Sequence, residues 1–117
     1  MSTVDSEFLQ GWVGSTETHC DVISVAPVSA LSASLDYLSP IARVGEALPP
    51  GWHWLYFQDA VAASKLAVDG HVRRGDFMPP VPLSRRMWVG GRLRFFSPVT
   101  IGDEVRRVST IASITHK

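Results

Sequence analysis

The sequence predicts an α+β domain in which antiparallel strands surround one short helix. Two segments, 15–25 and 104–115, alternate between apolar and polar residues as half-buried strands do. Residues 27–37 have a helical pattern whose polar side carries small side chains, which is typical of a helix enclosed by other structure. The length of 117 residues and the 45% hydrophobic content suit one domain with its own core.

The N-terminal region begins with a short amphipathic helix over residues 4–12. Phe8 and Trp12 are four residues apart and therefore share one face of this helix. Glycines at positions 11 and 14 then separate the helix from the strand predicted over 15–25.

The enclosed helix over 27–37 has start and stop signals. Ser24 is suited to cap its first turn, and Pro27 is tolerated there because the first backbone N–H groups have no intrahelical partner. Pro40 closes the segment, since the residue before a proline avoids the helical region. The apolar stripe of the helix consists of Val28, Leu31 and Leu35.

The middle of the chain mixes loops with aromatic sequence. Prolines and glycines predict a loop over 39–51, and the aromatic run at 52–57 predicts a buried strand or an aromatic wall. Residues 60–67 allow one or two helical turns, and 69–76 is a polar loop. The three prolines of 78–83 exclude that segment from a central strand.

The C-terminal third predicts an antiparallel hairpin of two strands, 87–96 and 104–115. The predicted strands number about three, whereas sheets usually have ~4–6. The last strand has no following strand to cover its edge. We therefore expect a sheet truncated at its C-terminal end, whose strand 104–115 pairs with sequence beyond residue 117 or with another chain.

Composition argues against several classes of protein. The 11 basic and 11 acidic residues give zero net charge, whereas a protein that binds nucleic acid is usually basic. Cys20 is the only cysteine, so it forms neither an internal disulfide nor a cysteine zinc site, which favours a reducing compartment. No apolar run approaches the ~20 residues of a membrane span, and residues 1–10 do not resemble a signal peptide. We expect a soluble, cytoplasmic domain with no nucleic-acid or membrane partner.

The zero net charge hides an asymmetry between the two halves of the chain. Residues 1–60 hold seven acids and one base, and residues 61–117 hold ten bases and four acids, so the halves carry −6 and +6. This pattern has two interpretations: mutual attraction within one fold, or a basic surface for an anionic ligand.

Three strings of the sequence are distinctive: LPPGWHWLYF (48–57), DGHVRRGDFMPPVPLSRRMWVGGRL (69–93) and FFSPVTIGDEV (95–105). Together with LQGWVGSTET (9–18) and APVSALSASLD (26–36), they resemble the N-terminal half of MaoC-like acyl-thioester hydratases and dehydratases. The similarity is to the mesaconyl-CoA and itaconyl-CoA hydratase type, and it spans nearly all 117 residues.

The resemblance implies a hot-dog fold, in which an antiparallel sheet wraps a central helix, here 27–37. It implies reversible addition of water across the double bond of an acyl-CoA, with no metal or redox cofactor and with CoA as part of the substrate. Members of the family have two hot-dog units, in one chain or in paired chains, and the C-terminal unit carries the catalytic aspartate and histidine. Residues 1–117 are then a single N-terminal hot-dog domain that pairs with a second unit, with a homodimer as the expected assembly.

The segment after the predicted helix departs from the family's catalytic sequence, which is an aspartate, an Asn-Pro step and a histidine. Asp36 and Pro40 are present, but the asparagine is missing and Ala42 stands where the histidine belongs. Asp36 is therefore interpreted as a helix-end or turn residue.

His71 is the other candidate acid or base, because Asp69 and Asp76 are close to it in sequence. Its polar, glycine-rich loop favours a solvated histidine instead. We therefore predict no catalytic residue in this chain, and His71 and Asp36 remain as the candidates to test. The other three histidines do not cluster with metal-ligating residues, so we predict no metal site.

Candidate substrate-binding residues are arginines and aromatics. Arginine binds phosphate with a planar fork of donors, so the pairs at 73–74 and 85–86 could meet the phosphates of CoA. The alternative is that they pair with the acidic half of the chain. Tryptophans and tyrosines could wall an acyl or pantetheine channel, or simply pack in the core. The predicted set is Arg85, Arg86, Trp88, Trp54, Tyr56 and Pro80, the last in the proline-stiffened segment before the second arginine pair.

The predicted function is that of an N-terminal hot-dog module of an acyl-CoA hydratase or dehydratase. It contributes scaffold and substrate channel, and we expect it to be inactive alone. Two alternatives stay open. One is an active thioester-processing homodimer with a site built from His71 or Asp36, and the other is a non-enzymatic acyl-CoA binding module.

Overall fold

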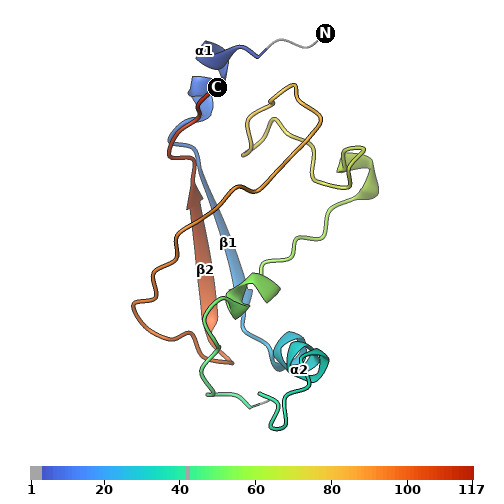
Figure 1. Cartoon of the computed structure of the whole chain (residues 1–117), viewed down its shortest axis with the longest axis vertical. Coiled ribbons are helices and arrows are strands. Elements are labelled where there is room, and N and C mark those ends of the chain that lie inside the picture. The colour runs from blue at the N-terminus through green and yellow to red at the C-terminus, as the bar shows by residue number, and fades with distance from the viewer. Residues whose placement is uncertain (1–3, 42) are drawn as a thin grey trace. The chain divides into compact units, whose positions relative to one another are not determined.

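The computed structural model describes residues 4–41 and 43–117. Its helices and strands are α1 (Ser6–Leu9), β1 (Thr16–Val22), α2 (Val25–Ser34) and β2 (Glu104–Thr110) (Figure 1). Three short 3₁₀ turns are η1 (Gln10–Trp12), η2 (Trp52–Leu55) and η3 (Ala63–Lys65). Among the described residues, no helix has both the length and the apolar character needed to cross a membrane.

The chain forms two compact units. The first unit contains residues 1–18, 59–90 and 108–117, and the second contains residues 19–58 and 91–107. The predicted N-terminal helix is confirmed in the first unit as α1 followed by η1. The Phe8 and Trp12 rings meet edge to face at 5.3 Å, as their spacing predicted.

β1 and β2 lie side by side in a two-stranded antiparallel sheet (Figure 1). The Ile23 N–H donates to the Asp103 carbonyl at 2.9 Å, and the Gly14 N–H donates to the Ile111 carbonyl at 2.8 Å. In both strands exposed residues alternate with half-buried ones, which confirms the predicted two-residue period. The predicted apolar side of 104–115 is wrong, because Val108 is 55% exposed whereas Arg107 is half-buried.

The predicted hairpin between 87–96 and 104–115 is wrong. β2 pairs with β1, ends at Thr110, and has no other ladder partner within residues 4–41 and 43–117. Residues 87–96 belong to neither strand of the sheet. A strand is defined by its partner, and the sequence of 87–96 alone does not supply one.

α2 begins two residues before the predicted 27–37 helix and ends three residues earlier. Ser24 occupies the N-cap position, but its side chain makes no capping hydrogen bond. Asp36 has a φ of +59° and its N–H donates to the Ala33 carbonyl, so the chain leaves the helix here. Val28 is fully buried as predicted, but Leu35 lies beyond the helix end and is 53% exposed.

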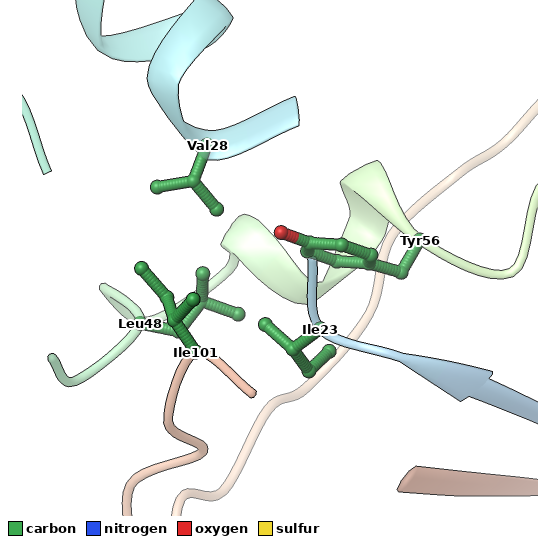
Figure 2. Close-up of a cluster of buried hydrophobic side chains, with 5 residues drawn as sticks. All are labelled: Ile23, Val28, Leu48, Tyr56 and Ile101. Atoms are coloured by element: carbon green, nitrogen blue, oxygen red, sulfur yellow. The ribbon is translucent and has the colours of Figure 1, made fainter. Parts of the chain in front are cut away.

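The core of the second unit gathers around α2. Figure 2 shows its buried side chains, which come from the end of β1, from α2, from the loops and from the turn before β2: Ile23, Val28, Leu48, Tyr56 and Ile101. The Tyr56 hydroxyl donates to the Ser24 carbonyl at 2.6 Å. The aromatic run 52–57 is thus not the predicted strand, because it turns through η2 before Tyr56 enters the core.

Candidate functional site

The basic loop of the first unit, residues 66–86, folds back on itself in a tight turn. Leu66 and Val72 form an isolated antiparallel bridge, and the Ala67 N–H donates to the His71 carbonyl at 2.7 Å. Gly70 takes a φ of +83° between them, a conformation that glycine adopts at no steric cost. The turn therefore presents Asp69 and His71 together at its tip.

The side chains of Asp69 and His71 are in contact. The His71 Nδ1 lies 3.1 Å from the Asp69 Oδ2, and the His71 backbone N–H donates to the Asp69 Oδ1 at 3.0 Å. The backbone donor is the main cause that lowers the pKa of the Asp69 carboxyl, and the imidazole and Arg86 lower it further. A carboxylate that holds one imidazole nitrogen leaves the other available for proton transfer. The His71 side chain is 59% exposed, so this pair lies open to solvent.

Arg86 is held against the same turn. Its Nε lies 3.4 Å from the Asp69 Oδ2, and its Nη2 donates to the Val72 carbonyl at 3.3 Å. Although the residue is near the surface, its side chain is only 26% exposed. These contacts orient the guanidinium.

Arg73 and Arg74 also bind backbone carbonyls of the basic loop. The Arg73 Nε donates to the Leu66 carbonyl at 3.3 Å. The Arg74 Nη1 donates to the carbonyls of Val81, at 2.7 Å, and Leu83. The proline-containing segment therefore holds Arg74, an arginine of the first pair.

These side chains line a pocket of about 390 Å³, which we name the arginine pocket. Its walls are Ala67, Val68, Asp69, Arg73, Arg74, Leu83, Ser84 and Arg86. Three guanidinium groups against one carboxylate give the lining a net charge of +2. Of the two predicted arginines, Arg86 lines this pocket and Arg85 does not.

The remaining predicted site residues lie in different surroundings. Pro80 is half-buried and Trp88 is 75% exposed, both in the first unit. In the second unit, Trp54 is 61% exposed, whereas Tyr56 is buried in the core.

Asp36 and Ala42, which were compared with the family's catalytic aspartate and histidine, follow α2 in the sequence. Asp36 ends the helix with an exposed side chain, as its helix-end interpretation predicted. Ala42 lies outside the described residues. Within the described ranges, no group of three or more His, Cys, Asp or Glu side chains is placed to hold a metal ion.

The second unit contains an apolar pocket of about 430 Å³ that the sequence analysis did not predict. It is lined by Ala47, Leu48, Pro49, Pro50, Gly51, His53, Phe95, Phe96, Ser97, Pro98 and Val99. The Leu48 N–H donates to the Val99 carbonyl at 2.7 Å and joins the two walls. The centroids of the His53 and Phe95 rings lie 6.2 Å apart, in an edge-to-face arrangement. Both walls come from distinctive strings of the sequence, LPPGWHW and FFSPV, which were the available signal.

Comparison with known proteins gives one family and two relatives. Residues 51–117 match the family described as hydroxyacyl-thioester dehydratase type 2. The mesaconyl-C(4)-CoA hydratase of Chloroflexus aurantiacus is 43% identical over 106 residues, which cover 91% of this chain and 38% of the relative. The mitochondrial hydroxyacyl-thioester dehydratase type 2 of Schizosaccharomyces pombe is 35% identical over 86 residues, which cover 68% of this chain and 29% of the relative. The chain therefore spans well under half the length of either relative.

Proposed function

The chain belongs to the hydroxyacyl-thioester dehydratase type 2 family, and on this premise we propose that it is the N-terminal hot-dog module of an acyl-CoA hydratase or dehydratase. The family match confirms the predicted resemblance to acyl-thioester hydratases and the hot-dog fold class. The observation that carries the proposal is the 43% identity to a mesaconyl-C(4)-CoA hydratase over 91% of the chain.

The proposed reaction adds water reversibly across the double bond of an enoyl thioester such as mesaconyl-CoA or itaconyl-CoA. It needs a base to activate water, an acid to protonate the α carbon, and N–H donors to stabilise the enolate oxygen. CoA enters as part of the substrate, and the proposal includes no other cofactor.

This module contributes scaffold and substrate channel. The apolar pocket supports that role, because its size lies in the ~300–1,000 Å³ range of ligand pockets and its walls are mostly apolar. We assign it the acyl or pantetheine part of the thioester, with Trp54 on the neighbouring turn η2.

The catalytic aspartate and histidine are assigned to a second hot-dog unit, in the same polypeptide or in a paired chain. Asp36 supports this division, because it ends a helix and no asparagine follows it. In the same proposal the assembly is a dimer of hot-dog units.

A hydration assay tests whether the catalytic groups lie in a second hot-dog unit and not in this chain. The 117-residue chain is incubated with mesaconyl-CoA, itaconyl-CoA or crotonyl-CoA, and loss of the conjugated double bond is followed by absorbance. We expect no turnover above buffer from this chain alone, and turnover when a second hot-dog unit is supplied. General acid and base groups contribute ~10²–10⁴-fold each, so the difference is easy to measure. Binding of acyl-CoA without turnover in either preparation would support the binding-module alternative.

The Asp69–His71 pair favours one alternative, an active homodimer that uses His71 as its acid or base. The pair is at 3.1 Å and exposed, so substrate could reach it. Turnover by the purified chain that His71→Ala abolishes, and that His116→Ala leaves unchanged, would establish this alternative and contradict the proposed module.

A further inference from the structure

The arginine pocket has the chemistry of an oxyanion site, and we propose that it binds phosphate groups of the thioester substrate through Arg73, Arg74 and Arg86. The inference rests on the proposed function and deepens it, because it names the part of the substrate that the first unit meets. It also assigns different roles to Arg85 and Arg86, because Arg86 lines the pocket and Arg85 does not.

The pocket holds its arginines in place before any ligand arrives. Arg74 is fixed by two carbonyls of the proline-containing segment, and Arg86 by the Val72 carbonyl and the Asp69 carboxylate. A guanidinium has five N–H donors, and these contacts occupy only part of them. Within residues 4–41 and 43–117, the Arg73 guanidinium is held through Nε, which leaves both of its terminal nitrogens for a ligand. An oriented arginine loses little side-chain entropy when it binds.

The charge of the pocket favours phosphate over a carboxylate. With three guanidinium groups and one carboxylate, the lining carries +2, which matches a phosphate monoester or a diphosphate better than a single carboxylate. The Ser84 hydroxyl adds a further donor to the same wall. Asp69 faces Arg86 and His71, so its charge is partly compensated within the loop.

Two sources could supply this phosphate. CoA carries a diphosphate and a 3′-phosphate, whereas a carrier protein presents one phosphodiester on its pantetheine arm. Dephospho-CoA lacks only the 3′-phosphate, 4′-phosphopantetheine keeps the single phosphate of a carrier arm, and pantetheine lacks every phosphate. Binding of 4′-phosphopantetheine as tight as that of CoA would indicate the carrier arm, and weaker binding would indicate CoA.

Isothermal titration calorimetry of the 117-residue chain tests the proposal with CoA, dephospho-CoA, 4′-phosphopantetheine and pantetheine. We expect CoA to bind, pantetheine to bind at least about tenfold more weakly, and the affinity for CoA to fall as salt rises. Weaker binding of dephospho-CoA would assign the pocket to the 3′-phosphate. Equal binding of CoA and dephospho-CoA would assign the pocket to the diphosphate, which both compounds carry. Equal binding of CoA, dephospho-CoA and pantetheine would overturn the proposal.

Variants locate the binding site. Arg73→Gln and Arg86→Gln should each weaken CoA binding about tenfold or more, because each removes a charge-assisted hydrogen bond. Arg92→Gln, an exposed arginine of the second unit, is the matched control and should leave binding unchanged. Arg85→Gln should also leave CoA binding unchanged. A loss of CoA affinity as large as that caused by Arg86→Gln would contradict the claim that only Arg86 of this pair lines the pocket. If Arg86→Gln disorders the basic loop, as faster amide hydrogen exchange in residues 66–86 would show, Arg73→Gln decides, since the Arg73 side chain makes one long hydrogen bond within the described residues.

The two proposals can fail separately. Unchanged CoA affinity in Arg73→Gln and Arg86→Gln, with enoyl-CoA turnover when a second hot-dog unit is present, overturns only the phosphate pocket. Tight CoA binding that depends on these arginines, without turnover under either condition, overturns only the hydratase assignment.

Discussion

The carboxylate of Asp21, on β1, accepts a hydrogen bond from the backbone N–H of Phe57 at 2.8 Å. Its other oxygen accepts from the Val22 N–H at 2.7 Å. Phe57 has a φ of +59°, a left-handed conformation that bulky residues rarely adopt. The Arg107 guanidinium lies 5.2 Å from the centre of the Phe57 ring. A charged side chain of the sheet thus secures the strained residue at the end of the aromatic run.

This contact predicts an acid-dependent loss of stability. The N–H donors of Phe57, and to a smaller extent Val22, lower the pKa of the Asp21 carboxyl below its usual 3.8. The folded state therefore binds this proton more weakly than the unfolded state. The stabilisation is present above the unfolded pKa and is lost as pH falls through the lower folded value. Urea unfolding from pH 7 downwards should show a smaller decline below about pH 5 for Asp21→Asn than for the wild type. Glu104→Gln removes the same charge without touching Phe57, and an equal effect from it would refute the argument.

Ile101 should be among the most costly positions to truncate. It is 1% exposed and packs in the core of the second unit (Figure 2). Ile101→Ala should lower the free energy of unfolding by about 2–5 kcal/mol, through lost burial and a residual cavity. Val108→Ala, at a position that is 55% exposed, should change it by less than about 0.5 kcal/mol. Denaturant unfolding measures the free energy of unfolding of both variants. Equal decreases in the two variants would contradict the assignment of Ile101 to the core.

Gly102 should not tolerate a side chain. Its φ is +101°, and a Cβ there would lie 2.8 Å from the Cγ1 of Val44. Gly102→Ala should therefore cost about 1–3 kcal/mol of stability. Gly11→Ala is the matched control, because its added Cβ meets nothing within 4 Å and its φ is not positive. It should be neutral or stabilise by up to ~1 kcal/mol, since alanine restricts the unfolded chain. If thermal unfolding showed that both substitutions destabilise the protein, or that both stabilise it, the result would contradict the turn geometry.

The Tyr56 hydroxyl should contribute to stability in its neutral form. Burial, and to a smaller extent the charge of Asp21, raises the pKa of Tyr56 above its usual 10.0. Its stabilisation is therefore present below the unfolded pKa and is lost as pH rises through the higher folded value. Tyr56→Phe removes the bond to the Ser24 carbonyl and should cost about 0.5–1.5 kcal/mol near neutral pH. It should also abolish part of the alkaline loss of stability, which denaturant unfolding of both proteins above neutral pH measures.

Local patterns in the sequence predicted local structure well. The alternation of 15–25 and 104–115 predicted the strands found at Thr16–Val22 and Glu104–Thr110. The small residues of 27–37 predicted the helix found at Val25–Ser34. The pairing of the strands was missed because alternation gives the two-residue period of a strand but does not specify the neighbouring strand. The aromatic run suggested a strand, but Gly51, with a φ of +90°, starts a turn there instead.

The candidate site was also predicted only in part, because the sequence shows residue types but not the groups that they contact in the fold. Arg86 and His71 were identified by residue type, and their shared partner Asp69 was close in sequence. The position of Arg74 depends on the carbonyls of Val81 and Leu83, and a loop without regular structure gives no period from which such contacts could be read.

The antiparallel ladder joins the start of the chain to its end. Ile23 donates to Asp103, and residues 24–102 lie between them. Closing so long a loop costs entropy before any ladder bond forms, so this sheet should form more slowly than α2, whose contacts are local. During synthesis β1 also leaves the ribosome well before β2 has been made. The ladder hydrogen bonds of the first strand can therefore form only after residues 104–110 have been made.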